Sequence, residues 1–210
     1  SITLPSTVTE IGDHAFSDCS DLIEVTFNDG LQKIGGGAFD DCTSLKRITL
    51  PSTVTEIGNR AFCDCRNLRE VVLNEGLQKI EDGAFWNCES LESIELPSTV
   101  VEIDNNAFTH CVNLREVTFN DGLQKIGYGA FHKCTSLKSI MLPSTATEIG
   151  SDAFNGCRNL REIKLNGVPQ CFKRDAFRDC AELERFSFPT MLLYRLENII
   201  QTNHWENLED

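Results

Sequence analysis

The chain has 210 residues, of which 40% are hydrophobic and 24% are charged. This composition is ordinary for a folded protein and argues against wholesale disorder, and no apolar run approaches the roughly 18 residues of a membrane helix. The net charge of −13 disfavours nucleic acids and anionic membranes as partners, because both attract basic patches.

The N-terminal residues match the middle of a repeating unit. Ser1 to Pro5 align with Arg47 to Pro51, and no Met precedes them. We therefore expect a fragment, or a processed product, of a longer array, with an uncapped N-terminal edge that is open to contacts. No signal peptide is visible, but a missing N-terminus makes that uninformative.

The rest of the chain repeats with a period of 23 residues up to about residue 188. Eight Ala-Phe pairs recur from Ala15-Phe16 to Ala176-Phe177. Eight of the ten cysteines keep the same spacing: Cys19, Cys42, Cys65, Cys88, Cys111, Cys134, Cys157 and Cys180. Such self-similarity is the signature of a repeat architecture.

Each unit contains two short extended segments and a turn. In residues 45–50, L-x-x-I-x-L has alternating apolar positions and predicts a strand, residues 54–58 predict a second extended segment, and A-F-x-x-C at 61–65 predicts a helical or 3-10 turn. The unit is too short for a strand and a long helix. We therefore predict a parallel solenoid with strands on its concave face and short extended or 3-10 segments on its convex side.

A second rhythm of 46 residues affects the turn after the first strand. Leu-Pro-Ser-Thr occupies this turn at 4, 50, 96 and 142, and Asn-Asp-Gly or Asn-Glu-Gly occupies it at 28, 74 and 120. Both are turn sequences, because Pro presets φ and Asn and Gly tolerate left-handed conformations.

The motif L-x-x-I-x-L-P followed by V-x-x-I-G-x-x-A-F-x-x-C resembles the BspA-like, or Treponema pallidum type, leucine-rich repeat. The resemblance covers about residues 1 to 188 and implies a solenoid and, for some members, microbial surface and adhesion roles. The last unit departs from the motif at Val168 to Lys173, where we expect a distorted convex segment.

Stacked coils turn each repeat position into a column. The Phe column predicts an aromatic spine in the core. For the cysteine column we favour free buried thiols, because parallel side chains neither converge on a metal nor face each other as disulfides require. Cys63-Asp64-Cys65 is a weak metal signal, and Cys171, in the irregular unit, could be exposed.

One exposed column alternates in charge from coil to coil. Its residues are Glu10, Lys33, Glu56, Lys79, Glu102, Lys125 and Glu148. Opposite charges on neighbouring strands stabilise their register. The alternative is that both residues were inherited with duplicated blocks of 46 residues.

The concave face supplies the candidate partner-binding residues, which would point outward from the strands. They are Glu24, Arg47, Arg69, Glu70, Arg115, Glu116, Met141, Arg161, Glu162 and Lys164. A merely solvated face, on which the arginines pair with neighbouring glutamates, is the alternative, since this surface has no Trp or Tyr anchors.

Catalysis finds little support. His14, His110, His132 and His204 fall at unrelated phases of the repeat, and Gly35-Gly36-Gly37 lacks the Lys-Ser/Thr of a phosphate loop. We therefore expect no enzyme, no cofactor and no metal.

Residues 190–210 differ from the array at 1–189. Leu192, Leu193, Leu196, Ile199 and Ile200 share one helical face, which predicts a capping helix and tail over the last coil. A partner-binding amphipathic helix is the alternative.

The leading hypothesis is a non-catalytic interaction scaffold that binds a protein or glycan through its concave or lateral surface. The alternatives are a rigid spacer in a longer protein and, less favoured, part of an enzyme. The resemblance implies a cell-surface or secreted location, whereas unpaired cysteines and the lack of an N-glycosylation sequon favour an intracellular one. Localisation and oligomeric state stay open.

Overall fold

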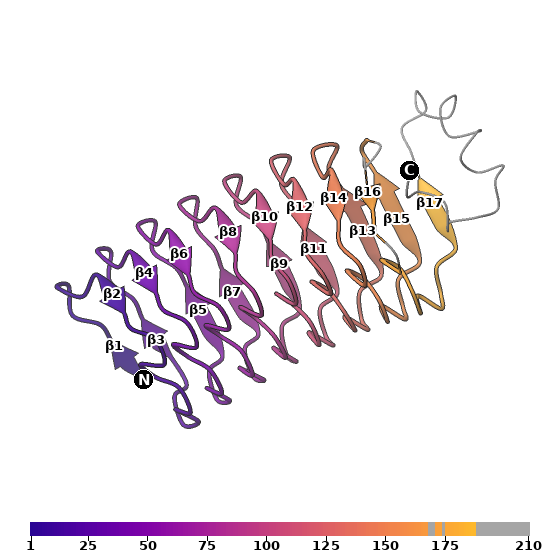
Figure 1. The fold of residues 1–210 in the computed structure, drawn as a ribbon. Coiled ribbons are helices and arrows are strands. Elements are labelled where there is room, and N and C mark those ends of the chain that lie inside the picture. The colour runs from indigo at the N-terminus through magenta and orange to yellow at the C-terminus, as the bar shows by residue number, and fades with distance from the viewer. Residues whose placement is uncertain (168–170, 174, 188–210) are drawn as a thin grey trace.

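The computed structural model describes residues 1–167, 171–173 and 175–187, without the side chain of Cys171, and these residues form a parallel solenoid (Figure 1). Each unit of 23 residues makes one coil, and we number the coils 1 to 8 from residues 1–23 to residues 162–184. The predicted fold class is therefore confirmed.

Every coil contributes two short strands to two separate faces. The odd-numbered strands are β1 (Ile2–Thr3), β3 (Val25–Thr26), β5 (Arg47–Thr49), β7 (Glu70–Val72), β9 (Ser93–Glu95), β11 (Glu116–Thr118), β13 (Ser139–Leu142), β15 (Glu162–Leu165) and β17 (Arg185–Ser187). The even-numbered strands are β2 (Glu10–Ile11), β4 (Lys33–Ile34), β6 (Glu56–Ile57), β8 (Lys79–Ile80), β10 (Glu102–Ile103), β12 (Lys125–Ile126), β14 (Glu148–Ile149) and β16 (Cys171–Phe172). We call the surface of the odd strands, predicted to be concave, the odd-strand face.

All strand pairs are parallel and shifted by one repeat. Ile2 pairs with Val25 on the odd-strand face, and Lys33 pairs with Glu56 on the even strands. The alternating column of glutamates and lysines therefore lies side by side, with Nζ of Lys33 3.0 Å from the carboxylate of Glu56. The predicted charge ladder is confirmed for this pair and for Glu102 and Lys125, which are also 3.0 Å apart.

The odd strands of coils 1 to 6 form two-stranded sheets that follow the rhythm of 46 residues, whereas the sheets of the even strands, β2-β4-β6 and β8 to β16, run across these pairs of coils. The odd strands pair as β1 with β3, β5 with β7 and β9 with β11, whereas no sheet continues from β3 to β5, from β7 to β9 or from β11 to β13. Inside each pair an Asn side chain joins the two turns. Nδ2 of Asn74 donates to the carbonyls of Pro51 and Val54 at 2.7 and 3.1 Å, and Asn28 and Asn120 make the equivalent bonds.

The A-F-x-x-C segment is not the predicted helical or 3-10 turn, and no helix occurs anywhere in the described residues. Its amides alternate between two acceptors: Asp40 donates to Gly37 in its own coil at 3.0 Å, and Phe39 donates to Ala61 in the next coil at 2.8 Å. Two residues four positions apart, such as Gly37 and Asp41, have φ near +57° and adopt left-handed conformations. A helix cannot continue through such residues. The segment therefore forms a series of turns that are hydrogen-bonded to the same segment of the next coil.

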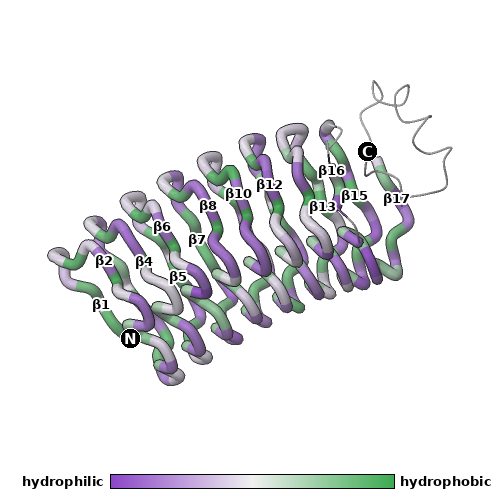
Figure 2. Tube along the Cα trace, viewed as in Figure 1, coloured by the Kyte–Doolittle hydropathy of each residue, from purple (hydrophilic) through white to green (hydrophobic). Residues whose placement is uncertain are grey.

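The interior is a set of uniform columns. Phe39, Phe62, Phe85, Phe108, Phe131 and Phe154 are fully buried, and consecutive rings in this column stack with centroids 5.2–5.5 Å apart. In Figure 2 hydrophobic segments recur at matching places along the coils. The predicted aromatic spine is confirmed.

The cysteine column forms a second ladder beside the rings. The thiol of Cys88 donates to the carbonyl of Phe62 at 3.2 Å, and the other thiols of the column from Cys42 to Cys180 repeat this bond. Nine cysteines are described and all are free, as predicted. The prediction for Cys171 falls on a side chain outside the described ones.

The C-terminal part of the array keeps its register as far as it is described. Cys171 and Phe172 pair with Glu148 and Ile149, so the distortion expected in the last unit is wrong for these two residues. Residues 168–170 and the predicted cap at 190–210 lie outside the described residues. The described residues contain no candidate for a membrane-spanning helix.

Candidate functional site

The candidate residues of the odd-strand face point outward, as predicted. Glu24, Arg47, Arg69, Glu70, Arg115, Glu116, Met141 and Arg161 are exposed, whereas Glu162 and Lys164 are half-buried. Met141 stands out as an apolar side chain that is 50% exposed, and Ile23 and Val72 are exposed hydrophobic residues on the same side of the array. A small hollow between coils 4 and 5 adjoins Val72, where the odd-strand sheet is interrupted.

Many charges on this face already have partners within the chain. Arg47 lies 3.5 Å from Glu70, and Lys164 lies 3.4 Å from Glu162. Arg115 contacts Glu92 at 3.3 Å, and Arg161 contacts Glu182 at 3.6 Å. These two arginines therefore do not pair with the glutamates that follow them in the chain, Glu116 and Glu162, as the alternative of a solvated face had suggested. This network fits both a solvated face and a binding face.

A second surface differs from coil to coil. It is built from the turns that connect each even strand to the next odd strand, and we call it the lateral turn edge. Its residues are His14, Ser17 and Asp18; Gly37, Asp40 and Asp41; Arg60, Cys63 and Asp64; Gly83, Trp86 and Asn87; Asn106, Thr109 and His110; Gly129, His132 and Lys133; Asp152, Asn155 and Gly156; and Asp175, Arg178 and Asp179.

The backbone explains why this surface tolerates diversity. The first and third residues of each set have positive φ, which favours Gly, Asn and Asp, yet Arg60, His110 and Lys133 adopt it too. Hydrogen bonds from the backbone amides of the turn to carbonyls of the neighbouring coils hold the turn in place, so its shape does not depend on any one side chain. The side chains at these positions can therefore differ from coil to coil without changing the turn.

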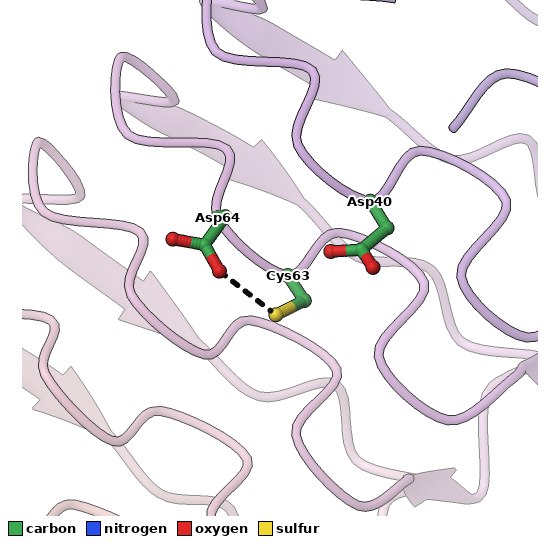
Figure 3. Close-up of side chains that lie close together, drawn as sticks. All are labelled: Asp40, Cys63 and Asp64. Carbon is green, nitrogen blue, oxygen red and sulfur yellow. Dashed lines mark hydrogen bonds between the residues drawn. The ribbon is translucent and has the colours of Figure 1, made fainter. Parts of the chain in front are cut away.

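Asp40, Cys63 and Asp64 form the tightest cluster of metal-ligand residue types within the described chain. One ligand atom from each lies within 4.8 Å of the others, and the thiol of Cys63 donates to Oδ2 of Asp64 at 3.4 Å (Figure 3). The neighbouring Cys65 points into the core instead, where it donates to the carbonyl of Phe39. The two cysteines of the Cys63-Asp64-Cys65 motif therefore do not converge on one point: Cys65 belongs to the buried cysteine column, and Cys63 belongs to the lateral turn edge.

The surroundings of Cys63 favour a protonated thiol. Burial raises its pKa to about 12, although Nη2 of Arg60, 3.6 Å from the sulfur, opposes this effect. Burial also raises the pKa of Asp64, but hydrogen bonds from Asn87, Arg66 and Cys63 outweigh it and lower that pKa overall. A thiol between a carboxylate and a guanidinium is a satisfied polar network, and Arg60 already provides the positive charge that a metal would bring.

Arg60 also links this network to the largest aromatic side chain of the edge. Its guanidinium carbon lies 5.3 Å from the ring centre of Trp86, in the geometry of a cation–π contact. Trp86 is the only tryptophan in the described residues and is partly exposed. Coils 3 and 4 therefore present an Arg and a Trp together on the lateral turn edge.

The lateral turn edge also brings together two histidines that the sequence analysis treated as unrelated. The rings of His110 and His132 meet edge to face, with centroids 5.9 Å apart. They come from different positions in the repeat, which become diagonal neighbours in adjacent coils. A spacing of 22 residues, one less than the repeat, is the signal that would have found this pair.

Comparisons with known proteins agree with the repeat pattern. The model of the BspA type leucine rich repeat region matches in six copies, over residues 1–115 and 101–207. No curated protein matches the chain.

Solved structures show the same fold. A leucine-rich repeat protein from Bacteroides ovatus ATCC 8483 is 32% identical with a TM-score of 0.82, over 89% of this chain and 48% of its own. A leucine rich cell surface protein from Faecalibacterium prausnitzii A2-165 is 29% identical, with a TM-score of 0.60, over 89% of this chain and 59% of its own. A T. pallidum leucine rich repeat protein is 29% identical with a TM-score of 0.66, over 94% of this chain and 81% of its own. The chain thus spans about half the length of the Bacteroides protein.

Proposed function

Since the chain belongs to the BspA type leucine rich repeat family, whose members are repeat scaffolds, we propose that it is a non-catalytic scaffold that binds a protein or glycan partner. A cell-surface role in adhesion is the sharper form of this proposal. It is supported by the similarity to a protein described as a leucine rich cell surface protein.

The observation that carries the proposal is the contrast between surfaces. In a solenoid that serves only as a rigid spacer, the outward residues can be the same in every coil, as the inward residues are. On the lateral turn edge, however, each coil differs, and coils 3 and 4 combine Arg60 with a partly exposed Trp86. Trp and Arg are the residue types that most often dominate binding energy at interfaces.

The odd-strand face is the second surface that this scaffold offers to a partner. Among its candidate residues Arg47 pairs with Glu70, Arg115 pairs with Glu92 outside the candidate set, and Met141 provides an exposed apolar contact. A partner on this face would have to exchange existing ion pairs for its own. We therefore assign the main contact to the lateral turn edge and test both surfaces in one experiment.

The test exposes the purified protein to a glycan array and to a displayed library of random peptides. A captured glycan or peptide is then measured against Trp86→Ala, and against a triple variant with Arg69→Glu, Arg115→Glu and Arg161→Glu. We expect the Trp86 variant to weaken capture at least about tenfold, as loss of a central interface residue does.

The other outcomes discriminate between the alternatives. Loss of capture only in the triple variant would move the site to the odd-strand face and overturn the assignment to the edge. If neither panel yields a ligand for the unmodified protein, the binding proposal fails in favour of a rigid spacer. Circular dichroism and melting of each variant exclude loss of folding as the cause.

A further inference from the structure

The contact between His110 and His132 is fixed by the backbone of coils 5 and 6. The amide of His110 donates to the carbonyl of His132 at 2.8 Å, and the ring planes are inclined by 77°. Both side chains are half-buried. The two imidazoles therefore cannot separate unless one side chain rotates away or the turn itself opens.

One nitrogen of this pair has an unusual environment. Nδ1 of His132 is buried and, within the described part of the chain, makes no hydrogen bond. A neutral imidazole with its proton on Nε2 can bury Nδ1 as a bare lone pair. A protonated imidazole instead places an N–H donor there, and a buried charged donor without an acceptor is strongly unfavourable.

Burial and the neighbouring cation Lys133 act in the same direction on both rings. Burial lowers the pKa of His132, and the neighbouring Lys133 and His110 lower it further, against weaker opposition from the Asp152 carboxylate and from a hydrogen bond between the ring and the backbone of Asn155, which leaves Nδ1 without a partner. Burial and Lys133 also lower the pKa of His110, which Glu89 opposes. In the closed arrangement both rings therefore stay neutral to a lower pH than a free histidine.

We propose that His132 is an acid-operated latch: when Nδ1 takes up a proton, the ring leaves its site beside His110 and the lateral turn edge opens locally around coil 6. The change consists of one proton taken from solvent and the loss of non-covalent contacts. Phe108 and Phe131 stay stacked beneath the turn at 5.2 Å, so the opening is confined to the edge. The latch needs no partner and stands apart from the proposed binding role.

The direction of the pH effect follows from proton linkage. In the open form the imidazole regains an ordinary pKa of about 6.5, whereas in the closed form its pKa is lower. Above pH 6.5 both forms are neutral, so opening does not depend on pH. Below it the open form binds the proton first, and the opening constant rises up to about tenfold for each pH unit until the closed form also titrates.

Two NMR measurements test the latch between pH 7.5 and 4.5. The ring nitrogen shifts of His132 should show the Nε2–H tautomer at pH 7.5 and titrate below 6.5. Amide exchange of His110 and His132, corrected for the intrinsic pH dependence of exchange, should accelerate between pH 6.5 and 5, by at most about tenfold for each pH unit. Titration at or above 6.5, or amide protection that stays constant with pH, would overturn the proposal.

Variants at this position separate the latch from general acid sensitivity. His132→Phe keeps a ring beside His110 and removes the titrating group, and His132→Asn places there the residue that coil 7 has in the same column. Both should abolish the acid-dependent exchange, while His14→Gln, which changes an exposed histidine of coil 1, should leave it intact. If both His132 variants fold and still open in acid as the unmodified protein does, His132 is not the latch.

Discussion

The interior and the lateral turn edge of the same coil follow opposite rules. Phe85 lies in the aromatic spine and is fully buried between Phe62 and Phe108, each about 5.5 Å away. Trp86, the next residue, lies on the lateral turn edge and has a different counterpart in every coil. Adjacent residues thus belong to the most uniform and the most varied parts of the molecule.

The difference has a physical origin in what each side chain must contact. An inward side chain meets the same position of the coils above and below, so a change in one coil must fit two identical neighbours. A side chain of the edge does not have to fit between two identical neighbours, because the turn beneath it is held by backbone hydrogen bonds to the adjacent coils. Uniformity therefore marks packing, and variation marks the surface where function can differ from coil to coil.

The largest effect we predict is on this pair of adjacent residues. Phe85→Ala should destabilise the protein by about 3–5 kcal/mol, because it removes a buried ring and leaves a cavity in the spine. Trp86→Ala should cost only about 0.5–1 kcal/mol, chiefly through its exposed contact with Arg60. Urea denaturation, with amide exchange to detect local unfolding of single coils, measures both. Equal losses for the two variants would contradict the division between interior and edge.

A smaller effect is expected at the turns that join coils in pairs. Asn74→Ala should cost about 1–3 kcal/mol, because this buried side chain donates to the carbonyls of Pro51 and Val54, and Pro51 alone keeps a second donor, the amide of Val54. Asn67→Ala is the matched control: it removes a single exposed bond to Thr43. The same denaturation measurement should rank Asn74→Ala well above the control, and the reverse order would show that the paired coils do not depend on this link.

The smallest effect concerns the charge ladder of the even strands. Lys125→Glu places a third glutamate between Glu102 and Glu148 and should cost about 0.2–1 kcal/mol, with the loss shrinking as salt is added. Lys138→Glu, an exposed change outside the ladder, alters the net charge equally. If both variants lose the same stability at low salt, the effect is one of net charge and the alternation does not control register.

The repeat made the solenoid predictable because it constrains every coil at once. Phe39 and Cys65 could be assigned to the core from their columns alone, and their burial confirms it. The A-F-x-x-C turn was predicted wrongly because the Gly, Asn and Asp residues at its two left-handed positions, interrupted by residues such as Arg60 and Lys133, were not taken as a signal for positive φ. The binding role of the odd-strand face remains a prediction, since exposure alone does not select a partner.

By itself, the sequence determined which side chains are stacked, since a constant period of 23 residues brings equal positions together and hydrophobic burial then fixes which of them face inward. The contacts between unequal positions were decided only by the tertiary structure. Arg60 lies over Trp86, and His110 meets His132, because the turns place neighbouring positions of adjacent coils on a diagonal. Such contacts depend on the path of the backbone between strands, which no column of the repeat records.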